Sequence, residues 1–441
     1  MLRPFANVLL GAALTATALV AQSPASPTLP NTPAGAVVKA WQDAYGSGDT
    51  LRILDYYRRY QPERVTQNTV QFRSQAGGFD IVSIERSEPR HLEFLTRERK
   101  TPQTYYAAVD LSPTDPPLIT SSYLIAMGPN ASAEAVRIDA AGRAKVIDGA
   151  ISKLDSFYVF PDVAKRMADS LRARRTRGAY DTYTNAISFS MKLNREVGEL
   201  GRDKHMRVNY SVRPIPPRPA TPPPPTPADS ARMRAQMDEF NCGFVKVEQL
   251  EGNVGYVKFN GFFDVGACGA TASAAMNFVA GSRALIVDLR ENGGGSPAMV
   301  AYVSSYLFST RTHLNDLWTR RTGATEEFWT RDDIPGRRFG GEKPVYVLTS
   351  AQTFSGAEEF SYNLKSLKRA TIIGETTGGG AHPVSGHPID EHFMIGVPFA
   401  RAVNPITRTN WEGVGVVPDV KVPAADALTT ALKLTREGVR Q

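Results

Sequence analysis

Hydrophobic residues recur at helical or strand spacing along most of this chain, and the first such stretch is helical. Val37, Val38, Trp41 and Tyr45 lie three or four positions apart, which predicts a helix from Ala34 to the glycine-containing turn at 46–49. Strand-like stretches follow at residues 68–73, 79–85, 105–111 and 119–126. A helix followed by an antiparallel meander predicts an α+β domain over residues 34–130.

Helical spacing returns after this domain and predicts a small helical bundle over residues 141–212. Two stretches on either side of Pro161 each carry a hydrophobic stripe, and a third predicted helix covers residues 184–200. The third helix ends before Asp-Lys-His-Met-Arg-Val at 203–208, where the pattern becomes strand-like.

Predicted strands and helices alternate in the last region, residues 241–430. Short β-branched and apolar runs predict strands at residues 254–259, 284–290, 345–348 and 371–373. Helical stretches lie between them at residues 271–280 and 355–367. This order predicts an α/β domain with a parallel or mixed sheet and helices on its faces.

Three further segments lack the pattern of a folded core. Residues 1–21 contain one positive charge, about 13 mostly apolar residues and then small residues, which is typical of a signal peptide and too short to span a bilayer as a helix. An uncleaved anchor is the alternative. Residues 22–33 form a Ser/Pro/Thr-rich linker, and residues 213–230 form a proline-rich spacer. We expect an exported protein, periplasmic or secreted, with no stable membrane insertion after signal removal.

Composition agrees with an ordinary globular protein of about three domains. The 441 residues are 42% hydrophobic, and the net charge of +7 is scattered along the chain, so nucleic-acid binding has no support. The two cysteines, Cys242 and Cys268, either form a disulfide or remain separate buried thiols, and the sequence favours neither. The six histidines show no metal-ligand spacing, so we expect neither a metal nor another cofactor.

Three features of the α/β region are able to carry chemistry. A predicted strand ends in the turn Asn-Gly-Gly-Gly at 292–295, where backbone amides can approach developing negative charge, although such a turn also serves simply to join a strand to a helix. Ser355 lies between a strand and a helix, where a nucleophile is exposed, but Ser355 and Glu358 also match a capping box. Glu412 lies in a Gly-containing predicted strand and either orients a base or is a solvated charge.

Four motifs occur in a fixed order, after the segment DKHMRV at 203–208: DLRENGGGSP, TFSGAEEF, IIGETTGGGAHP and NWEGVGVVPDV. Together they resemble the C-terminal-processing (tail-specific) serine peptidases, in the branch that includes tricorn-core and interphotoreceptor retinoid-binding-protein-like proteins. The resemblance covers residues 141–430 and implies a crotonase/ClpP-like catalytic domain, a spiral of ββα units. The element order of the N-terminal domain is similar to that of NTF2-like domains.

The resemblance also implies a role for individual residues. Ser355 matches the nucleophile, His205 the general base and Glu412 the carboxylate that orients the base. The amides of Gly356 and of Gly294, or of neighbouring Gly293, match the oxyanion hole.

This chain departs from the family pattern at several points. The tail-specific branch uses a lysine base in a Gly-Lys-Gly sequence, which here is Gly-Gly-Gly at 378–380, so a Ser–Lys mechanism is not expected. Lys204 stands where tricorn-like members have a small hydroxyl residue, and it either pairs with Glu412 or leaves a direct His205–Glu412 link. His382 is the alternative base. The spacer at 213–230 is too short to hold the PDZ domain of many relatives.

The sequence therefore predicts an exported serine peptidase that cleaves peptide or protein substrates through an acyl-enzyme. Two alternatives remain: a catalytically silent protein that binds peptides or apolar ligands on the same fold, and an esterase or amidase.

Overall fold

The computed structural model describes residues 27–62, 76–217, 224 and 226–437. These residues form two compact units, one that ends at Ala135 and one that begins at Val136. The predicted signal peptide and the predicted strand at 68–73 lie outside the described residues, as do parts of the linker and of the proline-rich spacer.

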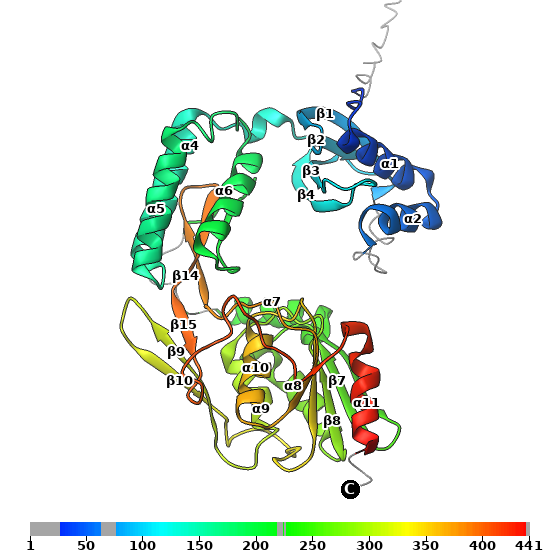
Figure 1. The fold of residues 1–441 in the computed structure, drawn as a ribbon, viewed down its shortest axis with the longest axis vertical. Coiled ribbons are helices and arrows are strands. Elements are labelled where there is room, and N and C mark those ends of the chain that lie inside the picture. The colour runs from blue at the N-terminus through cyan, green and yellow to red at the C-terminus, as the bar shows by residue number, and fades with distance from the viewer. Residues whose placement is uncertain (1–26, 63–75, 218–223, 225, 438–441) are drawn as a thin grey trace, which may run out of the picture. The chain divides into compact units, whose positions relative to one another are not determined.

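Among its described residues, the N-terminal unit contains helices α1 and α2 and a four-stranded antiparallel sheet in the order β1-β2-β3-β4 (Figure 1). The Thr32 side chain accepts the Gly35 amide at the start of α1, and Gly48 ends this helix with a φ of 79°. The sequence pattern did not reveal α2 or β2. The elements are α1 (Pro33–Ser47), α2 (Thr50–Tyr60), β1 (Phe79–Glu88), β2 (His91–Glu98), β3 (Gln103–Leu111) and β4 (Ile119–Pro129), with a 3-10 turn at Ala133–Val136.

The second unit begins with the predicted three-helix bundle: α4 (Ala140–Phe157), α5 (Pro161–Thr176) and α6 (Ala186–Gly201). After α6, β5 (Arg207–Tyr210) pairs with β14 (Phe393–Pro398), which pairs with β13 (Val384–Pro388). The buried residues of β14 also belong to the hydrophobic core of the bundle. The bundle is therefore joined to the α/β region through this sheet, whereas the sequence pattern suggested a boundary at residue 212.

A six-stranded sheet in the order β16-β12-β11-β8-β7-β6 forms the centre of the α/β region. Its neighbouring strands are parallel except for the antiparallel β6–β7 edge. Helices α8, α9 and α10 cover one face of the sheet, and α11 covers the other (Figure 1). The elements are β6 (Phe244–Leu250), β7 (Val254–Phe259), α8 (Val265–Val279), β8 (Ala284–Asp288), α9 (Pro297–Ser305), β11 (Val345–Thr349), α10 (Gly356–Ser366), β12 (Thr371–Gly374), β16 (Val420–Lys421) and α11 (Ala427–Glu437), with 3-10 turns at Asn241–Gly243 and Ala424–Asp426.

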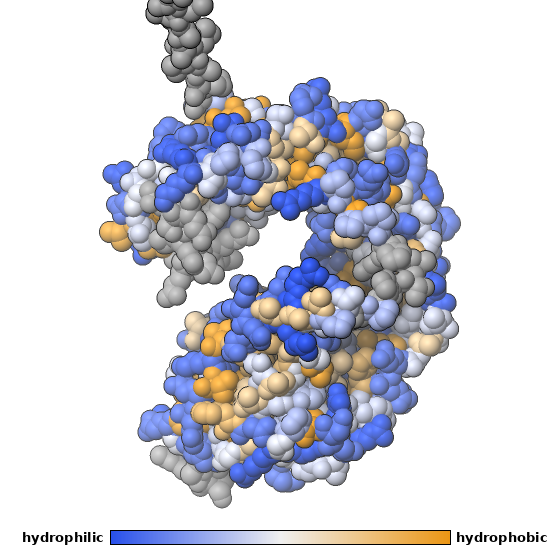
Figure 2. Space-filling model, turned by 180° about the vertical axis from the view of Figure 1, so that it is seen from behind, coloured by the Kyte–Doolittle hydropathy of each residue, from blue (hydrophilic) through white to orange (hydrophobic). Residues whose placement is uncertain are grey.

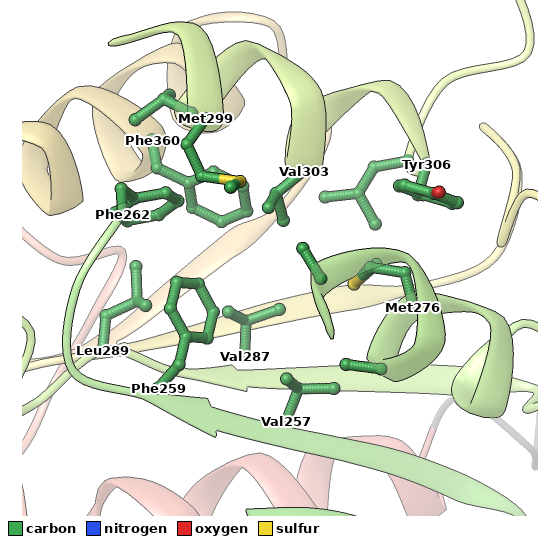
Figure 3. Packing of buried hydrophobic residues seen from close by; sticks show 14 of the residues in the cluster. Val257, Phe259, Phe262, Met276, Val287, Leu289, Met299, Val303, Tyr306 and Phe360 are labelled. Carbon is green, nitrogen blue, oxygen red and sulfur yellow. The ribbon is translucent and has the colours of Figure 1, made fainter. Parts of the chain in front are cut away.

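Buried side chains between the sheet and helices α8 to α10 form the largest core (Figure 3). Phe262 lies next to Phe360 of α10, with ring centroids 5.6 Å apart, and Phe259 of β7 packs edge-on against Phe262. Because these rings bury large apolar areas, they fix where α10 lies on the sheet. The start of α10, and with it Ser355, is thereby fixed as well.

Two further segments complete the unit. β9 (His313–Thr319) and β10 (Thr325–Trp329) form a hairpin whose sheet is completed by β15 (Ala400–Val403). Helix α7 (Pro227–Glu239) begins inside the segment that the sequence pattern predicted to be a spacer, because Thr226 and Asp229 form a capping box there.

Cys242 and Cys268 form a disulfide, with sulfur atoms 2.03 Å apart. The bond joins the turn before β6 to helix α8, and it resolves the alternative that the sequence left open.

Hydrophilic residues predominate on the face of the molecule shown in Figure 2, with hydrophobic residues scattered among them. In the part of the chain that the structure describes, every helix is too short or too polar to cross a bilayer.

Candidate active site

Ser355 occupies the turn between β11 and α10, as predicted. It is the N-cap residue of α10 and has a φ of 53° and a ψ of −120°. A positive φ is unusual for a residue with a Cβ and occurs most often where the surrounding structure forces it, as at functional turns. The position before the first turn of a helix also favours negative charge.

The glycine turn at 292–295 lies directly against Ser355. A Cβ atom on Gly294 would be 2.6 Å from the Gly356 amide nitrogen and 2.7 Å from the Ser355 Cβ, so only glycine fits here. Gly294, which has a φ of 96°, donates its amide to the Asn292 side chain at 2.8 Å. Gly293 donates its amide to the carbonyl oxygen of Asn260 at 3.2 Å.

These bonds correct the predicted oxyanion hole. The amides of Gly294 and Gly293 both donate to protein oxygens, so neither is available to an oxyanion in this structure. Within the described part of the chain, the amides of Gly356 and Gly295 have no hydrogen-bond partner. A Cβ on Gly356 would lie 2.9 Å from the Gly295 nitrogen, which places the two residues side by side next to Ser355.

His205 lies in the turn that connects α6 to β5, and the fold brings it to the Ser355 turn. Its ring lies 4.7 Å, centroid to centroid, from that of Phe354, the residue before Ser355. The His205 side chain is 10% exposed, and its Nδ1 atom has no hydrogen-bond partner among the described residues. Burial disfavours the charged imidazolium and lowers the pKa of His205 to about 4, although Asp203 opposes the shift. His205 is therefore neutral near pH 7, as a general base must be.

Glu412 lies near His205 in a turn, whereas the sequence pattern placed it in a strand. Residues 411–415 form tight turns that allow the Glu412 Oε2 atom to accept the Ala381 amide at 2.6 Å. The Oε1 atom is buried without a partner among the described residues. Burial, reinforced by the charge of Asp203, raises the pKa of Glu412 to about 7.

Asp203 and His382 link these groups into one buried network. His382 Nδ1 is 2.7 Å from Asp203 Oδ2 and 3.4 Å from Glu412 Oε2. Asp203 also accepts the His205 amide at 3.0 Å, and its Oδ1 atom is 3.9 Å from His205 Nδ1. His382, the predicted alternative base, is therefore hydrogen-bonded through Nδ1 to a carboxylate.

Glu358 connects the Ser355 turn to the triple glycine at 378–380. Its carboxylate accepts the Ser355 amide at 2.8 Å, the Gly379 amide at 2.6 Å and the Gly380 amide at 2.8 Å, and the Thr377 hydroxyl also donates to it. Glu358 thus reaches back to the N-cap residue, as the capping-box motif predicts. One buried carboxylate holds both segments in place.

Lys204 and Gly379 are two positions at which this chain differs from the family pattern, and the structure shows the contacts of both. The Lys204 Nζ atom donates to the carbonyl oxygen of Gly378, so Lys204 is bonded to the glycine turn and not to Glu412. Gly379 has a φ of 81°, and a Cβ there would lie 3.1 Å from backbone atoms of Gly413 and Gly415.

Donor atoms of Asp203, His205 and Glu412 lie within 4.8 Å of one another. Three ligands of one metal ion show a similar spacing, so these residues are the ones that could hold a cation in the described part of the chain. They are the same groups that surround the predicted base.

Sequence reasoning missed Asp203, Asn292 and the amide of Gly295. Asp203 belongs to the DKHMRV segment, but nothing in that segment distinguishes it from its neighbours. Its importance becomes visible only in the structure, where it contacts His382, 179 positions away. Asn292 precedes the three glycines of the turn. Its side chain accepts the Gly294 amide, so that this amide cannot donate to a substrate.

One family model matches the region that contains most of these residues. Residues 253–422 match the model of peptidase family S41. This segment is a peptidase family S41 domain. The matched region contains Ser355, the glycine turn, His382 and Glu412, whereas Asp203 and His205 lie outside it in the preceding bundle.

The chain is similar to several known proteins over different lengths. It is 30% identical to the tricorn protease of Thermoplasma volcanium over 161 residues, which cover 35% of this chain and 13% of that protein. A Parabacteroides merdae protein described as a candidate peptidase has a TM-score of 0.47 at 16% identity and covers 66% of this chain and 96% of its own. The photosystem II D1 C-terminal processing protease has a TM-score of 0.40 at 17% identity, over 65% of this chain and 94% of its own.

Proposed function

We propose that this protein is a serine peptidase that cleaves peptide bonds through an acyl-enzyme formed on Ser355. The observation that carries the proposal is the meeting of Ser355, the unpartnered amides of Gly295 and Gly356, and a buried neutral His205 at one turn. A nucleophile, a base and oxyanion donors are the three requirements of acyl transfer.

The proposed reaction has two halves, the formation of the acyl-enzyme and its hydrolysis, and the same groups act in both. Ser355 attacks the carbonyl carbon of the substrate while His205 accepts the Ser355 proton, and the amides of Gly295 and Gly356 stabilise the oxyanion. His205 then protonates the leaving amine. Water attacks the acyl-enzyme with His205 again as base, which releases the second product and restores Ser355.

Glu412 and Asp203 act on His205 in this scheme. The Nδ1 atom of His205 and the Oε1 atom of Glu412 are both buried without partners among the described residues. A hydrogen bond between them would stabilise the imidazolium that forms when His205 accepts a proton, and such bonds often shorten only when substrate is bound. Asp203 holds the His205 backbone and supplies a second nearby carboxylate.

Several finer features belong to the same proposal. The consecutive elements β6, β7 and α8 form a ββα unit, which supports the crotonase/ClpP-like spiral. The helices and meander of the N-terminal unit support an NTF2-like assignment. The disulfide supports export to the periplasm or beyond, because such bonds persist in oxidising compartments. The substrates are then exported proteins or peptides.

The decisive experiment is labelling of the purified protein with a fluorophosphonate, which reacts with activated serines, followed by peptide mapping. We expect the label on Ser355 and none in Ser355→Ala. Ser366→Ala, which removes a serine from the last turn of the same helix, is the matched control and should label at the wild-type rate. Equal labelling of Ser355→Ala would overturn the proposal, as would an unlabelled wild type, which a silent binding protein would give.

A second assay separates a peptidase from an esterase or amidase. The wild type is incubated with an unfolded protein and, separately, with a p-nitrophenyl ester. We expect Ser355-dependent fragments of the unfolded protein. Hydrolysis of the ester alone would assign the chain to the esterases.

A further inference from the structure

The N-terminal unit contains a cavity of about 220 Å³ that the proposed peptidase reaction does not use. Helices α1 and α2 and strands β2, β3 and β4 surround it. Its described lining residues are Val38, Trp41, Tyr45, Tyr56, Tyr57, Gln61, Phe94, Ala107, Ala108, Val109, Ile119, Ser122, Tyr123 and Leu124.

Aromatic rings supply much of the wall of this cavity. Tyr45, Tyr56 and Phe94 are buried, whereas Trp41 and Tyr57 are only partly buried. A buried floor and a partly exposed rim mean that a ligand can enter from solvent and lose most of its contact with water. Flat aromatic walls favour a flat aromatic ligand, because stacked and edge-on ring contacts add to the effect of apolar burial.

The described wall of the cavity offers polar atoms but no charged group. The hydroxyl groups of Tyr45 and Tyr57 are 2.9 Å apart, and Gln61 donates to the Ser122 hydroxyl at 3.3 Å. None of the described lining residues is acidic or basic. Burial also raises the pKa of Tyr45 and Tyr56, so their hydroxyls stay neutral. A charged ligand would lose its hydration without gaining a counter-charge.

The cavity is larger than an ordinary packing defect. Protein interiors are close-packed, and few voids exceed the volume of a water molecule. An apolar cavity of about 150 Å³ is already large enough to bind benzene. The larger cavity of this unit has room for a fused two-ring system.

We propose that the N-terminal unit binds an uncharged aromatic compound of about two fused rings, with a hydroxyl or carbonyl group that bonds to the Tyr45–Tyr57 or Gln61–Ser122 pair. The ring stacks among the aromatic walls, and the polar group selects its orientation. This binding site is independent of the Ser355 chemistry.

Isothermal titration of the full chain with 2-naphthol tests this site, with naphthalene-2-sulfonate as the charged probe of the same ring size. We expect 2-naphthol to bind at least tenfold more tightly than the sulfonate. N-acetyl-tryptophanamide presents a fused ring as a peptide side chain. Binding as tight as that of 2-naphthol would identify the ring as part of a peptide, and weaker binding would identify it as a free small molecule.

Two variants that fill the cavity with a larger side chain, and one control outside it, test whether 2-naphthol binds in this cavity. Ala107 pairs with Phe94 and Leu124 across the sheet, so Ala107→Leu places extra atoms in the cavity, and Ser122→Leu does so from the rim without touching the buried core. We expect either change to weaken 2-naphthol binding at least tenfold. Ala126→Leu adds the same side chain at an exposed position of β4 outside the lining and should bind as the wild type does. Absence of binding at about 1 mM 2-naphthol, or equal binding by folded Ser122→Leu, would overturn the proposal.

Discussion

Each of the two units buries a histidine among carboxylates, and the two histidines are held in opposite ways. In the N-terminal unit, His91 Nδ1 is 2.7 Å from Asp110 and Nε2 is 2.8 Å from Glu93. In the second unit, His205 is 3.9 Å from its nearest carboxylate, and its Nδ1 atom has no described partner. The same residue type therefore meets two different electrostatic environments.

The difference shows that burial does not by itself set the charge of a histidine. Burial lowers the pKa of both rings, but the hydrogen bonds and charges of Asp110 and Glu93 outweigh it and raise the pKa of His91 to about 9. For His205, burial dominates and the pKa falls to about 4. His91 is a protonated structural group, whereas His205 is free to take up a proton.

Replacing each histidine in turn should give the largest difference in the rate at which fluorophosphonate labels Ser355. We expect His205→Ala to slow fluorophosphonate labelling of Ser355 by about 10³-fold, the typical contribution of a general base. His382→Ala should slow it about tenfold, because His382 positions the carboxylates around His205. His91→Ala should label within about twofold of the wild type. Labelling of His205→Ala at the wild-type rate, with a loss in His382→Ala, would make His382 the base.

The pH dependence of stability tests the charge of His91. A group whose pKa is raised on folding stabilises the protein fully below its unfolded pKa of 6.5, and this stabilisation is lost as the pH rises through about 9. Relative to His91→Gln, the wild type should lose about 2–3 kcal/mol of unfolding free energy across this range. Urea unfolding series at several pH values measure the difference. Parallel curves for the two proteins would contradict the proposed ion pair.

The pH dependence of activity tests Glu412. Because burial raises the pKa of Glu412 to about 7, the carboxylate that stabilises the His205 imidazolium is mostly protonated at pH 6. The labelling rate at pH 6 should therefore be about a tenth of its alkaline plateau. In Glu412→Gln the labelling rate at the alkaline plateau should fall, and the rate should no longer change between pH 6 and 8. A wild-type profile that is flat over this range would remove Glu412 from the mechanism.

The sequence predicted the helices of the bundle and four of the six strands of the central sheet (β7, β8, β11 and β12), because their hydrophobic periods are regular. The predicted helix at 184–200 is α6 at Ala186–Gly201, for example. Helix α2 escaped prediction because, in its polar sequence, only Ile53, Tyr56 and Tyr60 are buried. Its hydrophobic stripe is too short to be recognised without the sheet against which it packs.

The sequence identified the segments that the fold brings together at the candidate site, but it did not identify the hydrogen bonds between them. Ser355, His205 and Glu412 were identified from motifs, and the fold brings their segments together. The choice between Gly294 and Gly295 depends on where the Asn292 side chain points, which a motif does not encode. The roles of Asp203 and His382 likewise depend on a contact between distant segments.

The left-handed backbone at Gly379 disfavours the lysine that a Ser–Lys mechanism would need at this position. Relatives with a Ser–Lys mechanism carry the lysine at the corresponding position. Here that residue has a φ of 81°, donates its amide to Glu358 and would place a Cβ 3.1 Å from backbone atoms of Gly413 and Gly415, so a side chain would strain the turn. Gly379→Lys would therefore disrupt the turn instead of converting the mechanism. A lysine at this position would therefore need compensating changes in Glu358, in the glycine turn or in the 411–415 loop.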